Sequence, residues 1–299
     1  MAEYVIQNEF LQVTVSGHGA EMTSIYNRKN EKEYLWNGDS TYWGRHSPVL
    51  FPIVGSLKDK KYTFQKKEYT MGQHGFARDQ EFILSHQTES ELFFTLTENE
   101  ETLKMYPFHF LLTVGYRLSG KQIEVIWNVE NKDTKTMYFQ IGAHPAFICP
   151  IDEEAEQTDC FLAFDNLSCL AVHKLDTSCG LMLPDVIHMP LQNEPGHETG
   201  YLPITEDLFD EDALILEDSQ TRKVSLCSYD MRPYVSVEFG TPLFGIWSPA
   251  KKHAPFICIE PWYGRCDAKD FNGTIKDRAY MNVLQAKQAF HASYTIEIE

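Results

Sequence analysis

The chain has 299 residues, of which 43% are hydrophobic, 23% charged and 13% aromatic, a composition that is typical of globular proteins and excludes a disordered one. Lys and Arg total 26 against 43 Asp and Glu, so the formal net charge is −17. Such a surface repels nucleic acids and anionic membranes, and we expect neither as a partner. A local basic pocket can still hold one anionic group, and the oligomeric state is not readable from the sequence.

The dominant pattern along the chain is the alternation of apolar and polar residues, which is typical of half-buried β-strands. Ser119-Gly120 separates two long alternating segments and predicts a tight turn between them. No amphipathic helix of four turns is evident, and the best helical candidate, residues 276–290, has a poor pattern. In chain order, we expect strands over residues 11–15, a hairpin over 62–71, and further strands over 82–84, 92–96, 110–118, 123–129, 137–141, 213–216, 223–228, 234–239, 256–259 and 294–298.

Many short strands and almost no helix predict an all-β protein, built as a large antiparallel β-sandwich or barrel. Residues 151–212 are the least regular part, with an acidic start and four prolines, and predict long loops over one face. No Gly/Ser-rich linker or repeat interrupts the chain, so we expect a single domain over residues 1–299.

The lack of a recognisable targeting signal and the pattern of cysteines bear on the compartment of the protein. No stretch approaches the ~18 apolar residues of a membrane span, and the first residues lack the basic and apolar regions of a signal peptide. The seven cysteines form an odd set without a CxxC pair, which favours reduced thiols over a disulfide framework or a zinc ribbon. We therefore expect a cytoplasmic protein. Cys258 lies in an apolar run and is better explained as a core residue than as a nucleophile.

Two segments place basic side chains in loops. His74 and Arg78 lie in the segment Gln73-His74-Gly75-Phe76-Ala77-Arg78, where Gly75 allows a backbone or a ligand to approach closely. Arg45 leads into the apolar segment that ends at Gly55, and its guanidinium suits hydroxyls or a phosphate. Taken alone, each segment is better explained structurally, the first as a turn with a surface His74 and a salt-bridged Arg78, the second as a loop with a surface Arg45.

Three further segments carry candidate acid–base groups. His144 follows the expected strand 137–141 and precedes a proline, so a rigid scaffold holds a side chain that titrates near neutral pH. Glu260 is the first carboxylate after the apolar run Ile257-Cys258-Ile259, and burial there raises the pKa of a carboxyl group. Trp262 offers a flat face for a sugar ring, and one acid of Asp210, Glu211 and Asp212 can point inward. A core histidine, a structural glutamate and a solvated acidic loop remain the alternatives.

Several motifs are absent, namely the P-loop, GxGxxG, HExxH and GxSxG. We therefore expect no nucleotide, no metal and no other cofactor. A metal site built from His46, His74, His144 and Glu260 is a further hypothesis, but these residues lack ligand spacing.

The ordered set of segments resembles the aldose 1-epimerase (galactose mutarotase-like) family, most closely its LacX-like and hexose-6-phosphate-mutarotase-like branch. The resemblance covers nearly the whole chain. It rests on residues 45–55, 74–78, 144–147, 212–216, 245–249 and 258–262.

The resemblance implies a large antiparallel sandwich with an open sugar-binding cleft, and the interconversion of the α and β anomers of a hexose or hexose phosphate. It assigns Glu260 as the catalytic base and His144, as the imidazolium, as the catalytic acid. It assigns sugar-binding roles to His74, Asp212, Arg45 and Arg78. The chain departs from galactose mutarotases at Pro145-Ala146, where they have Ser-Tyr, and at Pro261-Trp262, where they have Thr-Gln. A carbohydrate-binding or sensing protein without turnover is the alternative function.

Overall fold

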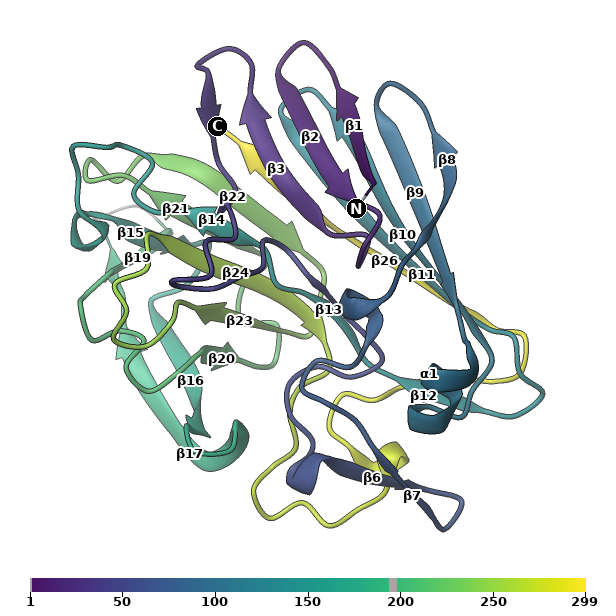
Figure 1. The fold of residues 1–299 in the computed structure, drawn as a ribbon. Coiled ribbons are helices and arrows are strands. Elements are labelled where there is room, and N and C mark those ends of the chain that lie inside the picture. The colour runs from purple at the N-terminus through teal and green to yellow at the C-terminus, as the bar shows by residue number, and fades with distance from the viewer. Residues whose placement is uncertain (1, 194–197) are drawn as a thin grey trace.

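The computed structural model describes residues 2–193 and 198–299. Antiparallel strands form two large sheets, accompanied by smaller ones, so the all-β prediction is confirmed (Figure 1). Among the described residues, no helix is long and apolar enough to cross a bilayer.

The larger sheet has ten strands. At its centre β10 and β11 form the longest hairpin, and Ser119 pairs with Gln122 across the predicted turn at Gly120. Gly120 has φ 59°, a conformation that glycine adopts without strain. The strand order is β18 (Gln192–Asn193), β19 (Gly200–Pro203), β15 (Phe161–Phe164), β21 (Lys223–Cys227), β22 (Pro233–Phe239), β26 (Ala289–Ile298), β11 (Gln122–Asn131), β10 (Phe110–Ser119), β9 (Glu91–Thr97) and β8 (Ile83–Gln87).

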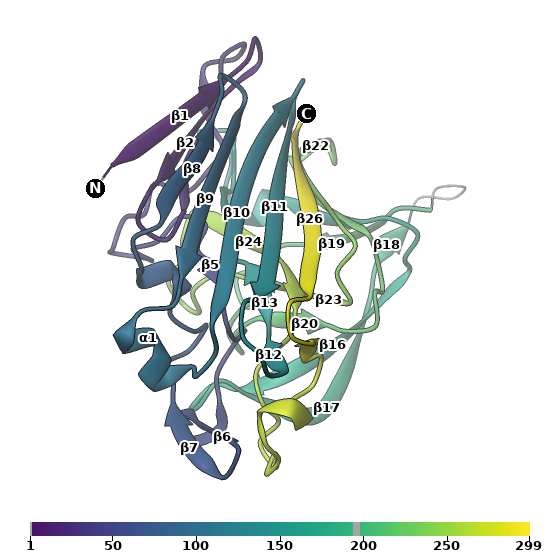
Figure 2. The ribbon, with the colours of Figure 1, turned by 90° about the vertical axis from the view of Figure 1, so that its right-hand side faces the viewer.

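The second sheet has eight strands and lies behind the long strands of the first (Figure 2). Its order is β17 (Leu181–Pro190), β16 (Cys169–Asp176), β20 (Leu214–Leu216), β23 (Leu243–Trp247), β24 (Phe256–Tyr263), β13 (Ile141–Ala143) and β5 (Val49–Leu50), with β14 (Ala146–Ile148) paired to β24.

Smaller elements flank these sheets. The one α-helix of the described residues, α1 (Glu100–Met105), was not predicted because it has fewer than two turns; it begins at a capping Asn99. The small sheets are β1 (Glu3–Gln7), β2 (Leu11–Ser16), β3 (Met22–Asn27) and β4 (Lys32–Glu33); β6 (Lys61–Phe64) with β7 (Lys67–Thr70); and β12 (Met137–Phe139) with β25 (Asn282–Leu284).

The main core lies between the two large sheets. The residues of β24 alternate between this core and the other face of the eight-stranded sheet. Ile257 and Ile259 belong to the large core cluster, whereas Cys258 and Trp262 belong to smaller clusters. Because successive strand residues point to opposite faces, Glu260 shares the second face with Cys258 and Trp262. This face of the eight-stranded sheet carries the candidate site.

Two expectations were wrong, whereas the poor helical pattern of residues 276–290 agrees with a segment that holds β25, the start of β26 and only a short 3-10 helix at Ile275–Asp277. The segment 151–212 contains five strands, and β16 and β17 form a long hairpin whose prolines lie in an edge strand, where a missing N–H is tolerated. The strand expected over 137–141 is split between two sheets at Gln140. The buried Gln140 side chain accepts hydrogen bonds from the Val54 N–H and from Arg278.

Candidate active site

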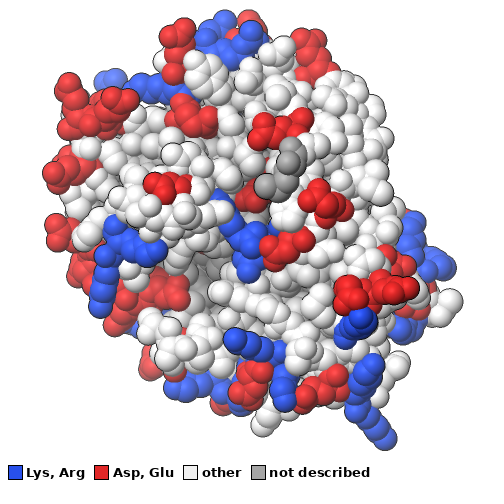
Figure 3. Space-filling model, in the orientation of Figure 1, with Lys and Arg blue, Asp and Glu red and all other residues white. Residues whose placement is uncertain are grey.

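A cavity of about 530 Å³ opens on the second face of the eight-stranded sheet. The space-filling view shows a hollow on this side of the molecule, with basic and acidic side chains near its rim (Figure 3). The volume falls within the ~300–1,000 Å³ that is usual for small-molecule sites. The lining residues with polar or aromatic side chains include Tyr42, Trp43, Gln73, His74, Arg78, His144, Thr177, Asp210, Asp212, Trp247, Lys252, Glu260 and Trp262.

Glu260 lies in the middle of the sheet, on β24, opposite Gly245 of β23. Its side chain is 1% exposed, yet it lines the cavity. Burial raises the pKa of this carboxyl group well above its ordinary value, and the negative charge of Asp212 raises it further. The direction of the shift is the predicted one, but β24 continues to Tyr263, so Glu260 lies inside the buried strand and not at its end.

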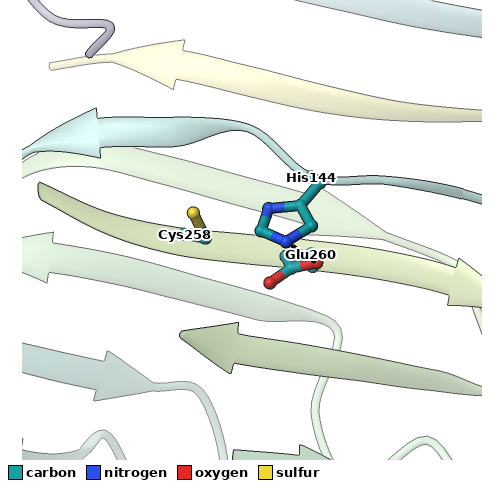
Figure 4. Close-up of side chains that lie close together, drawn as sticks. All are labelled: His144, Cys258 and Glu260. Carbon is teal, nitrogen blue, oxygen red and sulfur yellow. Dashed lines mark ion pairs between the residues drawn. The ribbon is translucent and has the colours of Figure 1, made fainter. Parts of the chain in front are cut away.

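His144 follows β13 and faces Glu260. Its Nε2 lies 3.3 Å from Oε2 of Glu260, and the close-up shows the ring directed at the carboxyl group (Figure 4). Burial lowers the pKa of His144 to about 3, and the positive charge of Arg78 lowers it further. The two residues predicted to carry the chemistry are therefore brought together in one cavity.

The protonation state differs from the one that the resemblance implies. Burial disfavours the charged form of each group, which favours a protonated Glu260 beside a neutral His144. A carboxylate Glu260 beside an imidazolium His144 would carry the same single proton on the other residue. Nε2 and Oε2 lie 3.3 Å apart without a hydrogen bond between them, so a proton can pass directly only after the two groups move closer.

His74 lies beside this pair, in a left-handed conformation with φ 65°. Nδ1 of the His74 ring accepts a hydrogen bond from the Gly55 N–H at 3.1 Å, and the backbone N–H of His74 donates to the Gly55 carbonyl at 3.0 Å. A Cβ at Gly75 would lie 2.2 Å from the Phe51 carbonyl oxygen, so only glycine lets the backbone at Phe51 pack this closely against residue 75. The His74 ring lies edge-on to His144 at 5.7 Å, and burial lowers its pKa well below the ordinary value.

The two predicted arginines have different surroundings. Arg78 lines the cavity and donates from Nη2 to the Gln73 carbonyl at 2.8 Å, and its buried Nε lies 3.9 Å from Oδ2 of Asp79 without a hydrogen-bond partner among the described residues. Arg45 is not among the lining residues and pairs through Nη2 with Asp79 at 2.7 Å. Its charge nevertheless lowers the pKa values of His74 and His144. Arg78 thus brings a guanidinium to the cavity wall, whereas Arg45 acts on the cavity through its charge.

The three acidic residues before β20 have different surroundings. Asp210 and Asp212 line the cavity, whereas Glu211 forms an ion pair with Lys174. Asp212 has φ 74°, and its Oδ1 accepts a hydrogen bond from the Ala213 N–H at 2.8 Å. Asp212 is therefore held by the turn, and its carboxylate is close enough to raise the pKa of Glu260.

Trp262 lies across the sheet floor. Its Nε1 donates to the Ala143 carbonyl at 3.1 Å, so the indole presents an apolar surface to the cavity. Cβ atoms added at Gly142 and Gly245 would lie 2.5 and 2.3 Å from the indole. Glycine on both neighbouring strands makes room for this side chain, as close packing requires.

Potential metal ligands are arranged differently from the hypothesis. Within the described part of the chain, one group has metal-ligand spacing: His144, Cys258 and Glu260, whose ligand atoms lie within 4.8 Å of one another (Figure 4). His46 lies instead beside Glu21, 3.7 Å from its carboxylate. Burial and the neighbouring Glu260 raise the pKa of the Cys258 thiol, which keeps it protonated and a poor ligand.

Several residues that line the cavity were not predicted from the sequence. Trp43 stacks on His144 with ring centroids 4.7 Å apart, and Trp247 meets the same ring edge-on at 5.3 Å. Thr177 and Gly180 reach the cavity from the turn between β16 and β17, in a segment expected to be loops. The aromatic residues next to the basic motif at Arg45 were the available signal for Trp43.

These features define an all-β protein with a cavity of about 530 Å³ in which an imidazole and a carboxyl group lie 3.3 Å apart. A family model described as aldose 1-epimerase matches residues 2–273, and the chain belongs to this family of isomerases. Protein LacX of Lactococcus lactis subsp. lactis, in plasmid and chromosomal forms, is 34% identical over 98% of both chains.

Solved structures agree on the fold. A galactose mutarotase related enzyme from Lactobacillus acidophilus has a TM-score of 0.91 at 34% identity, covering 100% of this chain and 97% of the other. A galactose mutarotase-like protein from Lactobacillus casei ATCC 334 has a TM-score of 0.90 at 32% identity, covering 100% of both chains. The galactose mutarotase-like sandwich expected from the resemblance is confirmed.

Proposed function

We propose that this protein interconverts the α and β anomers of a hexose or hexose phosphate by acid–base ring opening and reclosure. The observation that carries the proposal is the 3.3 Å contact between His144 and Glu260 at the floor of a cavity of sugar size. A glycosidase would need two carboxylates flanking a glycosidic bond. Asp210 and Asp212 also line the cavity, but the group that contacts Glu260 is an imidazole, which favours ring opening over hydrolysis in this proposal.

The chemistry begins with the single proton of the pair. The pKa directions favour this proton on Glu260, and in the proposed reaction it passes to His144 when sugar hydroxyls and the ring oxygen solvate the charged form. Glu260 then removes the proton of the anomeric hydroxyl while His144 protonates the ring oxygen, and the C1–O5 bond breaks. The open aldehyde turns about C1–C2. His144 takes the proton back as O5 attacks C1, and Glu260 returns its proton to O1 on the other face.

The surrounding residues suit a polyhydroxylated ring. Arg78 brings a guanidinium to the cavity wall, Asp212 and Asp210 offer acceptors, and Trp262 offers an apolar surface. Arg78 and Lys252 are the cationic lining residues, and Lys252 already donates to the Tyr42 carbonyl at 2.9 Å. The negative charges of Asp210 and Asp212 offset the two positive charges in the same cavity, which favours a neutral hexose over a hexose phosphate. Binding of a phosphate would require Arg78.

A carbohydrate-binding or sensing protein on the same fold is the second candidate. The observation that favours it is the shift of both pKa values toward the uncharged forms, since hydrogen bonds to a sugar need no proton transfer. This reading predicts tight sugar binding without faster equilibration of the anomers.

Two further proposals concern the whole chain. We propose a single domain over residues 1–299, because the main core cluster draws on residues from Ile6 to Ile298. We propose a cytoplasmic location, because all seven cysteines carry free thiols, and Cys149, Cys160, Cys227, Cys258 and Cys266 are buried.

A substrate panel tests the proposed function. Exchange between anomers is measured by NMR for free and 6-phosphorylated glucose, galactose and mannose, with and without the full-length protein. Faster exchange of at least one sugar is expected, with free hexoses ahead of their phosphates. Saturable sugar binding without faster exchange of any member would replace the enzyme by the binding protein.

A further inference from the structure

The orientation of His144 poses a specific question. Catalytic histidines are usually fixed by a hydrogen bond from the second ring nitrogen to a carboxylate or carbonyl. In His144 the Nδ1 atom is buried and has no hydrogen-bond partner among the described residues. His144 is 7% exposed, so solvent reaches little of the residue and does not fix the orientation of its ring.

Aromatic rings take the place of that hydrogen bond. Trp43 covers one face of His144, with centroids 4.7 Å apart and an interplanar angle of 28°. Trp247 and His74 meet the ring edge-on, at 5.3 Å and 85° and at 5.7 Å and 79°. A stacked face and two perpendicular edges leave the imidazole little freedom to rotate, so its Nε2 stays directed at Glu260.

The backbone around Trp43 is itself anchored. The Trp43 N–H donates to the Asp39 carbonyl at 3.0 Å, and the Trp43 carbonyl accepts from Nε1 of Trp36 at 2.8 Å. Lys252 donates to the neighbouring Tyr42 carbonyl at 2.9 Å. These contacts fix the loop on both sides of Trp43.

A second anchor lies a few residues further on. Oε1 of Glu21 accepts from the N–H groups of His46 and Ser47 at 2.6 and 2.9 Å. The hydrogen bonds of this carboxylate lower its pKa against the opposing effect of burial, so it stays charged at neutral pH. These five hydrogen bonds hold the loop that carries the indole stacked on His144.

We propose that Trp43 is a positioning residue, whose indole keeps the imidazole of His144 directed at Glu260 and shielded from water. This inference rests on the proposed acid–base function of the same site. It assigns to stacking the task that a hydrogen-bonded partner performs elsewhere. Because burial is the main cause of the low pKa of His144, the indole also keeps His144 unprotonated until a substrate binds.

The test replaces Trp43 by Leu, which removes the stacked ring, and by Phe, which retains one. For Trp43→Leu we expect kcat to fall about 10- to 100-fold, since small displacements of a catalytic group have effects of this order. We expect KM to change little, and the acid limb of the pH profile to move about one unit or more toward neutral pH as water reaches the ring. Trp43→Phe should retain most of the wild-type behaviour.

Tyr42→Leu is the matched control, because Tyr42 lies in the same loop and lines the same cavity but contacts Trp36 instead of His144. It should leave the acid limb in place. A Trp43→Leu variant with raised KM but unchanged kcat and pH profile would make Trp43 only a platform for the sugar. An equal shift in Tyr42→Leu would mean that loosening the loop, not loss of stacking, is responsible.

A second measurement separates this inference from the proposed function. The titration of His144 is followed by NMR of the imidazole nitrogens in wild type and Trp43→Leu, with the resonance assigned by its loss in His144→Gln. A higher pKa in Trp43→Leu is expected even if no tested sugar is turned over. An unchanged titration would overturn the inference while leaving mutarotation untouched.

Discussion

Nε2 of His144 lies 3.3 Å from Oε2 of Glu260. One residue follows β13 and the other lies in β24, the adjacent strand, where Gly142 pairs with Trp262. This register puts the imidazole over the strand position that holds the carboxyl group. An acid and a base so placed can act on two oxygens of one pyranose ring.

Removing either member should remove the function of both. We expect His144→Gln to lower kcat/KM about 100- to 10,000-fold, the usual contribution of a positioned proton-transfer group. The double variant His144→Gln with Glu260→Gln should be no slower than the worse single variant, because the groups act as a unit. Multiplying losses in the double variant would show that the two residues act independently.

The pH dependence follows from the pKa directions. The form with one proton is active, so activity falls on the acid side as His144 gains a second proton, near its pKa of about 3, and on the alkaline side as Glu260 loses its proton. Arg78 disfavours the imidazolium, so in Arg78→Gln the acid limb of kcat/KM should move to higher pH. Arg232→Gln removes an exposed cation that pairs with Asp230 and does not contribute to the shift, and a matching movement there would contradict the assignment.

Glu260 should also affect stability. Its folded-state pKa is raised, so its favourable contribution is complete below pH 4.5 and is lost as the pH rises toward the folded-state pKa. Glu260→Gln removes this dependence. We therefore expect a higher Tm for the variant than for wild type at pH 8, by about 2–4 °C per kcal/mol, and a smaller difference at pH 4.5. Thermal melts at the two pH values check this, and a lower Tm of the variant at pH 8 would show the carboxylate to be stabilising.

The floor of the cavity depends on two glycines. Gly245→Ala places a Cβ 2.3 Å from the Trp262 indole, so we expect a loss of about 1–3 kcal/mol in the free energy of unfolding, measured by urea denaturation. Adding Trp262→Leu should restore much of that loss by removing the clash. If the double variant is no more stable than Gly245→Ala, the strain lies elsewhere than at the indole.

Sequence patterns predicted what depends on local order. Alternation located most strands, because burial on one face repeats every second residue, and the apolar run before Glu260 gave the direction of its pKa shift. Contacts between distant segments were not predictable in this way. The stacking of Trp43 on His144 and the sheet change at Gln140 both arise from tertiary packing that leaves no periodic signal.

The protonation of His144 shows the same limit. A histidine at a strand end was expected to act as the imidazolium, but burial and the charge of Arg78 lower its pKa to about 3. Neither influence is encoded next to His144 in the chain. The segment 151–212 was likewise expected to be loops, and its β16–β17 hairpin instead carries Thr177 to the cavity.

The most direct test of the central claim is the rate of anomer equilibration of freshly dissolved α-hexose, followed by polarimetry, with wild type and Glu260→Gln at equal concentration. We expect wild type to accelerate equilibration and the folded variant, verified by circular dichroism, to leave the spontaneous rate unchanged. Equal acceleration by both proteins would contradict the assignment of Glu260 as the group that takes the anomeric proton.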